Sequence, residues 1–595
     1  MIRQSKLVTA PIALLTRLRL ALMRHEELTS VMAWAALIGF LGATSCVLFR
    51  DGIRLFEFLL TGKYGDLVQV AESLKDWQRV IIPCAGGYLA GLVLYFGARV
   101  LPGQRSVDYM EAIVVGNGAI QARPTLIRSL SSLCSIASGG SIGREGPMVQ
   151  LAGLIGSKIG TFLGVPVPRL RLMVACGASA GITAAYNAPI SGALFVAEIV
   201  MGSIAMESFG PLLVSAVTAN VTIHHFLGFS SVFAAPQFQF VSNWELLFYA
   251  VLGVLLGHLA PPFLALLKTA KHQFAKLNWP TYLTMAAGGM LVGGISMFVP
   301  EVWGNGFSTV SGILNGDIIG WMLLIILLTK VLSTAITVGS GAVGGVFTPT
   351  LFAGAAIGAL FGGALHLAMP HHVANGSAYA LVGMGGFLAA TTHAPLMSIL
   401  MIFEMTLDYN VVLPLMLACV TAHYAAKVYR HGRSIYQDTL DPEVQEKTDD
   451  QREWHLQTIN ALIKPCSAIV HRGTSLQQVL NTLPKRAVDA IYVVNEDNEL
   501  VAWVDPHKLI NDVGGSGVSV VQDIDALATP VPLSLQTGMS LGAALDVFLR
   551  SDDVLTLPVI ANAWHSTLVG QVSRHDLLLA VQDQIASRNK QAAAG

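Results

Sequence analysis

One short segment of the sequence places an acidic residue between two apolar stretches. The segment Gly140–Pro147 reads Gly-Ser-Ile-Gly-Arg-Glu-Gly-Pro and holds Glu145 at what we expect to be membrane depth. An ionisable side chain at that depth costs about 3 kcal/mol or more, so it indicates a functional site. The flanking glycines and proline argue against a continuous helix, and a broken helix is tolerated in a membrane only where it is buried in protein or lines a water-filled cavity. We therefore predict that Glu145 is a gate on a path through the membrane.

The residue types around this acid suit the passage of an anion. Chloride must leave water, and a full buried positive charge would hold it too tightly. Backbone N–H groups at helix N-termini supply a weaker, distributed positive potential. Glycine lets that backbone approach the ion, and proline begins the next helix. A neighbouring glutamate competes with the anion until it is protonated, so one side chain could both block the path and carry a proton.

The composition is that of a membrane protein with a soluble part. Of the 595 residues, 53% are hydrophobic and 12% are charged, whereas soluble domains are nearer a quarter charged. With a net charge of −1 and no basic patch with interleaved aromatic residues, we expect no nucleic-acid partner. The cysteines are scattered without a Cys-x-x-Cys pair, so we expect no disulfide or metal site. They are Cys46, Cys84, Cys134, Cys176, Cys419 and Cys466.

Apolar stretches that must position the acid follow one another along the first 430 or so residues. Several are shorter than the ~20 residues that cross a bilayer, and many are glycine-rich and end at proline. Short interrupted segments of this kind point to a transport site near the middle of the membrane. The stretches lie near 31–49, 80–100, 126–139, 147–163, 170–186, 189–203, 209–228, 245–268, 282–299, 319–338, 349–368, 377–391, 395–406 and 410–427.

The apolar region repeats itself. Gly177, Pro189 and Glu198 recur as Gly383, Pro395 and Glu404, each at an offset of 206 residues. The break Gly143–Pro147 corresponds to Gly345–Pro349 at an offset of 202 residues, and each break is followed by a segment rich in alanine and glycine. We predict two structural repeats, at about 28–230 and 243–437. The residues themselves leave open whether the repeats are parallel or inverted.

The rest of the chain divides by composition. Residues 1–27 carry arginine and lysine among apolar residues, which is typical of an amphipathic helix on the cytoplasmic face or of a plain basic tail, and either reading puts the N-terminus in the cytoplasm. The transmembrane region is predicted at 28–437. A polar linker at 438–455, a soluble α/β unit at 456–585 and a disordered tail at 586–595 complete the chain.

The soluble unit is itself doubled. Leu500–Val504 and Leu568–Val572 resemble each other at an offset of 68 residues, and each half has a further predicted strand, at Ala490–Val494 and at Leu557–Ile560. Each half is expected to close with a helix.

Together these motifs resemble the ClC family of chloride channels and chloride/proton exchangers. The resemblance rests on Gly143–Pro147, Gly345–Pro349, Asn187-Ala-Pro189 and the doubled C-terminal unit, in that family's order, and covers most of residues 30–585. Asp108–Ala112 is similar to the ClcB-like bacterial branch. The family implies an α-helical polytopic membrane protein with inverted repeats of broken helices, plus a cytoplasmic pair of CBS modules. It also implies a homodimer with one pore per subunit, in the bacterial inner (plasma) membrane, with both termini cytoplasmic.

The resemblance also assigns roles by position. Glu145 corresponds to the family's external gating glutamate, and Arg144 and Gly146 beside it are expected to contact the anion. The backbone N–H groups of Val346 and Phe347 correspond to those that face the central anion, and Tyr436 to the tyrosine that contacts it from the cytoplasmic side. Core packing for the Phe347 ring and an interfacial position for Tyr436 are the structural alternatives.

Two departures from the family pattern bear on the mechanism. The serine that usually coordinates the central anion aligns with Gln104, although Ser106 lies close by, so the anion preference is open. Bacterial exchangers have two consecutive glutamates where this chain has Glu198 and Ile199. The second glutamate is therefore missing here, which favours a channel or weak proton coupling. We interpret Glu198 as structural.

Several alternatives accompany the chloride prediction. A strict chloride/proton antiporter is the main one, and a fluoride exporter is disfavoured by the intact Gly-Arg-Glu-Gly-Pro. A signalling protein with the CBS pair as its output is another class; this pair could bind an adenine nucleotide or act as a dimerising clamp. A membrane-embedded hydrolase built on Ser138–Ser141 lacks a Gly-x-Ser-x-Gly motif and a placed histidine, so we predict no enzyme and no cofactor. His393 is either a proton relay or a structural histidine, and Lys330 is expected to bind backbone carbonyls or an acid at the repeat interface.

Overall fold

The computed structural model describes most of the chain as two compact units, within residues 1–444 and 445–595. The described parts of the first unit are 28–101, 107–202, 206–228, 233, 242, 244–428 and 434–435. Those of the second are 458–482, 490–506, 523–529, 531, 533–549, 554–561 and 566–582. Each unit is considered by itself below. The predicted basic segment 1–27, the linker 438–455 and the tail 586–595 lie outside the described residues.

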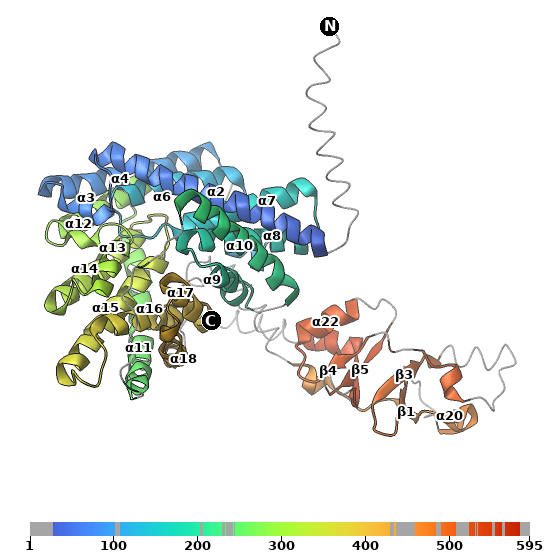
Figure 1. The fold of residues 1–595 in the computed structure, drawn as a ribbon. Coiled ribbons are helices and arrows are strands. Elements are labelled where there is room, and N and C mark those ends of the chain that lie inside the picture. Colours follow the sequence, from blue (N-terminus) through green and yellow to red (C-terminus); the bar gives the residue numbers. More distant parts are fainter. Residues whose placement is uncertain are drawn as a thin grey trace, which may run out of the picture. The chain divides into compact units, whose positions relative to one another are not determined.

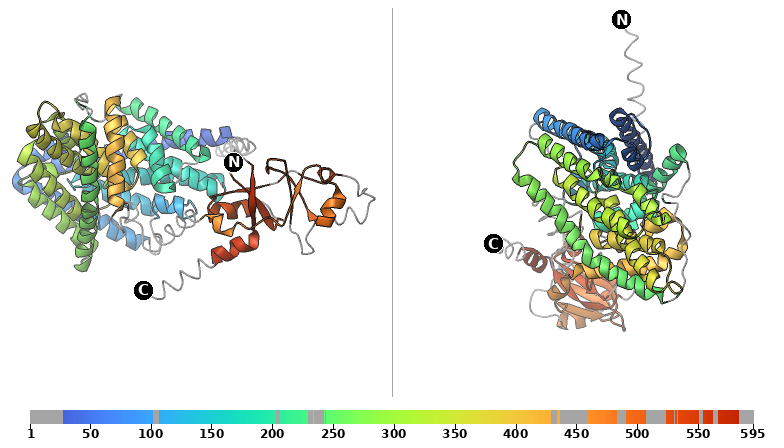
Figure 2. Two further views of the ribbon diagram at one scale, coloured as in Figure 1. Left: turned by 90° about the horizontal axis from the view of Figure 1, so that it is seen from below. Right: turned by 90° about the vertical axis from the view of Figure 1, so that its left-hand side faces the viewer.

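The first unit is helical throughout its described part, and its helices lie side by side at varied tilts (Figures 1 and 2). In its first half these are α2 (Leu28–Thr61), α3 (Leu67–Glu72), α4 (Asp76–Val100), α5 (Tyr109–Val114), α6 (Ala122–Ala137), α7 (Glu145–Leu163), α8 (Val167–Tyr186), α9 (Pro189–Leu194), a π-helix (Phe195–Met201) and α10 (Met206–Leu227). In its second half they are α11 (Glu245–Lys276), α12 (Thr281–Ser296), a 3₁₀ turn (Pro300–Val302), α13 (Phe307–Asn315), α14 (Gly320–Gly339), α15 (Phe347–Ala368), α16 (Gly376–Thr392), α17 (Pro395–Thr406), a 3₁₀ turn (Tyr409–Val411) and α18 (Val412–Lys427).

In the part of the chain that the structure describes, six helical segments are long and apolar enough to cross a membrane. Shorter apolar helices, Pro189–Met201 and Pro395–Thr406, stand between them, as the interrupted hydrophobic stretches predict. The six segments are Ser30–Thr61, Asp76–Val100, Glu245–Lys276, Gly320–Gly339, Phe347–Ala368 and Tyr409–Lys427.

The internal repeat of the sequence is also a repeat of the backbone. Helix α8 ends at Asn187 with φ 56° and ψ 34°, and α16 ends at His393 with φ 61° and ψ 27°. These left-handed residues stop each helix, which costs a non-glycine side chain some strain. The alanine that follows each is not helical, with φ −127° and ψ 84° at Ala188 and φ −124° and ψ 78° at Ala394, and a proline at once begins the next helix, α9 or α17. The offset of 206 residues therefore relates two helix–break–helix units with the same conformation.

Close approach within each repeat depends on small residues. Helix α7 packs on α8, and α15 packs on α16 in the second repeat. A β-carbon added to Gly177 would overlap the carbonyl of Ala152, and one added to Gly354 would overlap the carbonyl of Gly383. Glycine at these positions lets the helix backbones touch, which is how helices associate tightly in a membrane.

The second unit contains two three-stranded sheets with the same strand order. One consists of β1 (Ala468–His471), β2 (Ile491–Val494) and β3 (Leu500–Val504), and the other of β4 (Leu535–Gln536), β5 (Thr556–Ile560) and β6 (Leu568–Ser573). In each, the first pair is parallel and the second antiparallel. Helix α20 (Leu476–Thr482) or α22 (Leu541–Leu549) lies between the parallel strands in the sequence. The starts of β3 and β6 also meet, since Leu500 N–H donates to the Ser566 carbonyl at 2.8 Å. The doubling read from the offset of 68 residues is confirmed.

Candidate functional site

The two predicted helix breaks meet in the structure. Gly143 and Gly345, one from each repeat, form an antiparallel bridge in which Gly143 N–H donates to the Gly345 carbonyl at 2.7 Å. Gly345 N–H donates back to the Gly143 carbonyl at 2.8 Å. Helix α7 begins two residues after the first glycine, and α15 begins two residues after the second. This bridge therefore brings two helix N-termini together, where the positive ends of both helix dipoles attract negative charge.

Glu145 is the first residue of α7 and is buried at this junction, with 3% of its surface exposed. Its Oε1 accepts a hydrogen bond from the Thr348 hydroxyl, which comes from the opposite break. Its Oε2 is buried and has no hydrogen-bond partner among the described residues. A β-carbon on Gly143 or on Gly345 would overlap this carboxylate, so glycine on both sides leaves room for it in this position. The carboxylate is therefore enclosed, and only one of its two oxygens is hydrogen-bonded within the described structure.

A second hydroxyl extends this contact. Tyr186 Oη and Thr348 Oγ1 lie 2.9 Å apart, and because Thr348 donates to Glu145, Tyr186 must donate to Thr348. The Tyr186 ring also packs on the Phe347 ring, with centroids 4.8 Å apart. The sequence reading did not find Thr348 or Tyr186. The signal was available: Thr348 lies inside the break Gly345–Pro349, and Tyr186 directly precedes the break at Asn187.

Phe347 lies at the second helix break. It is the first residue of α15, and its side chain is buried, with 3% exposed. Neither Val346 N–H nor Phe347 N–H donates to another described residue. Two backbone donors are thus left for a ligand at the start of α15.

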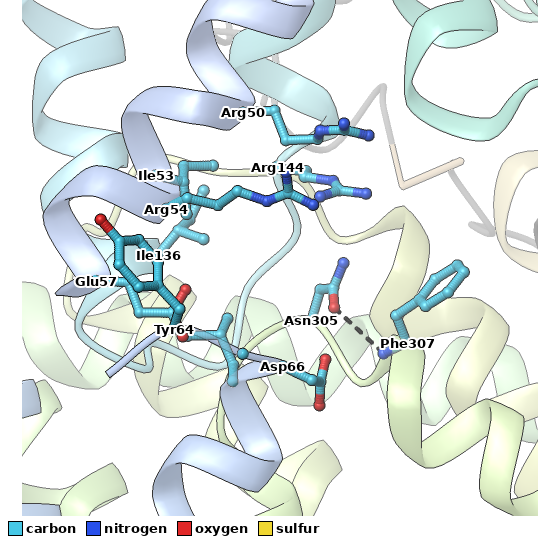
Figure 3. A pocket seen from close by; sticks show the side chains of 12 residues that line it. Arg50, Ile53, Arg54, Glu57, Tyr64, Asp66, Ile136, Arg144, Asn305 and Phe307 are labelled. Atoms are coloured by element: carbon cyan, nitrogen blue, oxygen red, sulfur yellow. Dashed lines mark hydrogen bonds between the residues drawn. The ribbon is translucent and has the colours of Figure 1, made fainter. Parts of the chain in front are cut away.

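A cavity of about 550 Å³ lies on one side of the junction (Figure 3). Arg144 lines it, together with Arg50 and Arg54 from α2. The other lining residues are Ile53, Glu57, Tyr64, Gly65, Asp66, Leu67, Ile136, Asn305 and Phe307. We call it the arginine cavity.

A second cavity, of about 370 Å³, is lined by residues at both helix breaks. Gly146 and Val346 are among them, and so are three cationic residues, Arg128, Lys268 and Lys271. We call it the lysine cavity. Glu145 lines neither cavity, although Arg144 before it lines one and Gly146 after it lines the other. Its buried carboxylate thus lies at the position where a path joining the two cavities would pass.

Three predicted anion contacts, Gln104, Ser106 and Tyr436, lie outside the described residues. Their described neighbours are informative. Asp108 and Ile435 both line the lysine cavity. Ile435 is held there by its N–H, which donates to the Thr391 carbonyl at 2.9 Å. The structure therefore brings both stretches of chain to the cavity that also holds Gly146 and Val346.

Glu198 and its repeat partner Glu404 are each bound to the other repeat. Glu198 accepts hydrogen bonds from the N–H groups of Leu396 at 3.3 Å and Met397 at 2.8 Å, at the start of α17. Glu404 accepts from the N–H groups of Ile190 and Ser191, both at 2.8 Å, at the start of α9. Each acid thus caps the helix that the equivalent break begins, in keeping with the structural interpretation of Glu198.

Lys330 is buried, with 1% exposed, and its ammonium group is held by the chain itself. Its Nζ donates to the carbonyls of Glu301, Val302, Trp303 and Gly304 at 2.8 to 3.2 Å. The predicted role as a partner of backbone carbonyls is confirmed. His393 lies edge-on to His423, with ring centroids 5.8 Å apart.

Comparisons with known proteins agree with this arrangement. Residues 85–427 match the family model described as voltage gated chloride channel, and residues 521–583 match that of the CBS domain. A putative chloride channel protein, ClcB-like, of Ralstonia nicotianae is 53% identical over 400 residues, which are 67% of this chain and 93% of that protein. A voltage-gated ClC-type chloride channel, ClcB, of Escherichia coli is 40% identical over 410 residues, which are 68% of this chain and 96% of that protein.

Solved structures show the same fold. A slow cyanobacterial Cl⁻/H⁺ antiporter matches with a TM-score of 0.62 and 24% identity, over 71% of this chain and 99% of its own. A eukaryotic CLC transporter matches with a TM-score of 0.56 and 18% identity, over 92% of this chain and 97% of its own. The wider coverage of the second match extends beyond the helical unit into the tandem sheets.

Proposed function

The chain belongs to the family of voltage-gated chloride channels, and from this premise we propose that it carries chloride across a bacterial inner membrane with Glu145 as the gate. The observation that carries the gate assignment is the burial of this one carboxylate between two cavities that are both lined by cations. Fold and family agree with a transporter or channel rather than with an enzyme.

The geometry suggests how the gate works. When Glu145 is ionised, it occupies the positive field of the two helix N-termini, and the Thr348 hydroxyl holds one of its oxygens. A chloride ion would need the same field. Protonation removes the negative charge, weakens this competition and lets the side chain leave. The donors at Val346 and Phe347 then face the anion. Gln104, Ser106 and Tyr436, which lie outside the described residues, are the further contacts expected from the family resemblance.

The choice between channel and exchanger turns on the proton route from the cytoplasm. Glu198 is engaged by two backbone donors, and the next residue, Ile199, is buried and cannot bind a proton. We propose a channel or a weakly proton-coupled exchanger. A strict chloride/proton antiporter is the alternative, and it would require water to carry protons past Ile199.

The test is chloride efflux from proteoliposomes over a range of pH. Wild-type efflux should rise as pH falls, because protonation opens the gate. Glu145→Gln resembles the protonated acid, so its efflux should equal or exceed the wild-type maximum and lose most of its pH dependence. Glu72→Gln is the matched control, since this acid is exposed and lines neither cavity. An unaltered pH dependence in Glu145→Gln would overturn the gate assignment.

We also propose a homodimer with one pore in each subunit. Support comes from apolar side chains that are exposed in the single subunit, on the short helices α9 and α17 and on α18. Ile190 on α9 is 41% exposed and Leu396 on α17 is 50% exposed, while Leu413 and Met416 on α18 are 58% and 50% exposed. Exposed apolar side chains of this kind fit contact with a second copy of the chain as well as with lipid, and the mass of the purified protein in detergent distinguishes a dimer from a monomer.

A further inference from the structure

The arginine cavity gathers three guanidinium groups. Arg50 and Arg54 come from α2, four residues apart and so on one face of the helix, and Arg144 directly precedes the gate. Figure 3 shows their side chains together at one end of the cavity. Like charges held close together repel, and removing them from water adds to that cost unless a negative group lies among them.

The protein supplies these arginines with little countercharge. Arg50 and Arg144 form no ion pair within 4.0 Å with any other described residue, and the buried Nε of Arg50 has no hydrogen-bond partner there. Arg54 has one contact, at 3.9 Å to Asp51, between side chains that are 61% and 57% exposed. Exposed pairs of this kind contribute little. The guanidinium donors are therefore left to face the cavity.

Two carboxylates also line the cavity but do not neutralise the arginines. Glu57 is 4% exposed, and its Oε1 is buried without a partner in the described structure. Asp66 lines the far end, below the arginines in Figure 3. With three cations against two acids the lining keeps a positive excess, and that excess lies at the end next to Arg144.

Asn305 adds a neutral donor. Its Oδ1 accepts from Phe307 N–H at 3.2 Å, and Figure 3 shows the amide nitrogen turned toward the arginines. The first helix turn of α13 begins at the same Phe307. An anion among the arginines would thus meet an amide donor as well as guanidinium groups.

We propose that the arginine cavity is an anion-loading site, in which Arg50, Arg54 and Arg144 hold a partly hydrated monovalent anion before it reaches Glu145. This inference rests on the proposed function and extends it, because it names the site that recruits chloride. The volume of about 550 Å³ is many times that of one water molecule, about 30 Å³, so the ion keeps part of its water. Water keeps the binding weak and exchange fast, as a loading site requires.

The test compares chloride flux curves of full-length variants in proteoliposomes at low ionic strength. The double variant Arg50→Gln/Arg54→Gln should raise the half-saturating chloride concentration about three- to tenfold and leave the maximal flux within about twofold, because it weakens recruitment and leaves the gate intact. Addition of a large organic anion salt should remove the difference, since salt screens exposed charges. Arg50→Lys/Arg54→Lys is the matched control, which keeps the charge and should stay near the wild type.

A variant of opposite sign protects the test against misfolding. Asp66→Asn removes a negative charge from the same cavity and keeps a side-chain oxygen to cap α3, so it should lower the half-saturating concentration. If the flux curves of Arg50→Gln/Arg54→Gln and of the wild type coincide, or if only the maximal flux of this double variant falls, the proposed loading site is wrong while the chloride function stands. If the wild type itself carries no chloride, it is the proposed function that fails.

Discussion

At the scale of single residues, the carboxylate of Glu145 depends on a hydroxyl supplied from more than 200 positions away. Thr348 and Tyr186 form a donor chain that ends on one oxygen of Glu145, while its other oxygen has no hydrogen-bond partner in the described part of the structure. A hydrogen bond to an ionised group is worth about 1.5–3 kcal/mol. The two hydroxyl groups therefore stabilise the ionised form of Glu145, which blocks the path in the proposed mechanism.

Removal of that hydroxyl should make the gate easier to open. In Thr348→Val the ionised form of Glu145 loses its donor, so the pH of half-maximal chloride efflux should move up by about one unit or more. Thr348→Ser keeps the hydroxyl and serves as the control. Efflux curves that coincide for valine, serine and wild type would show that this hydrogen bond does not hold the gate.

The buried ammonium group of Lys330 stabilises the fold. Lys330→Met leaves four buried carbonyls without their donor, and we expect a loss of stability of about 3 kcal/mol. Thermal unfolding of the purified protein measures this loss. Lys427→Met, at an exposed position near the end of α18, should change the unfolding temperature little; an equal drop in both variants would contradict the role given to Lys330.

At the scale of helices, two glycines on α15 are predicted to respond in opposite directions. Gly354→Ala would press a methyl group against the Gly383 carbonyl of α16, so it should destabilise the protein. Gly363→Ala meets nothing within 4 Å and should stabilise the helix by about 0.5–1 kcal/mol through its backbone entropy. Unfolding temperatures of the two variants test this directly, and a rise in both would mean that α15 and α16 are not in close contact at Gly354.

The helices also show which parts of the fold the sequence could predict. Breaks at Gly143–Pro147 and Gly345–Pro349 were predictable because glycine and proline act locally. The first apolar stretch was predicted to end near residue 49, yet α2 continues to Thr61. Charged residues such as Arg50 and Arg54 interrupt the apolar pattern, so that pattern predicted neither the last turns of α2 nor the arginine cavity beside them. Thr348 itself stands inside a predicted break, but its contact with Glu145 could not be predicted, because this contact joins two repeats that only the folded chain brings together.

At the scale of the molecule, the two repeats of the helical unit together build the candidate site around Glu145. Each repeat supplies one helix N-terminus to the gate and one acid that caps a helix of its counterpart, as Glu198 and Glu404 do. Neither repeat alone could build the site. The CBS unit repeats its own strand order in the same way. The sequence leaves two roles open for it, binding of an adenine nucleotide and dimerisation as a clamp, and titration of the full chain with nucleotide tests the first.

The central claim is that protonation of one buried carboxylate opens a chloride path. Simultaneous recording of chloride and pH from liposomes across an imposed chloride gradient tests it most directly, with the wild type and Glu145→Gln side by side. The account predicts that the glutamine variant carries chloride at least as fast as the wild type and moves no protons with it. Proton movement that stays tied to chloride flux in Glu145→Gln would contradict the account.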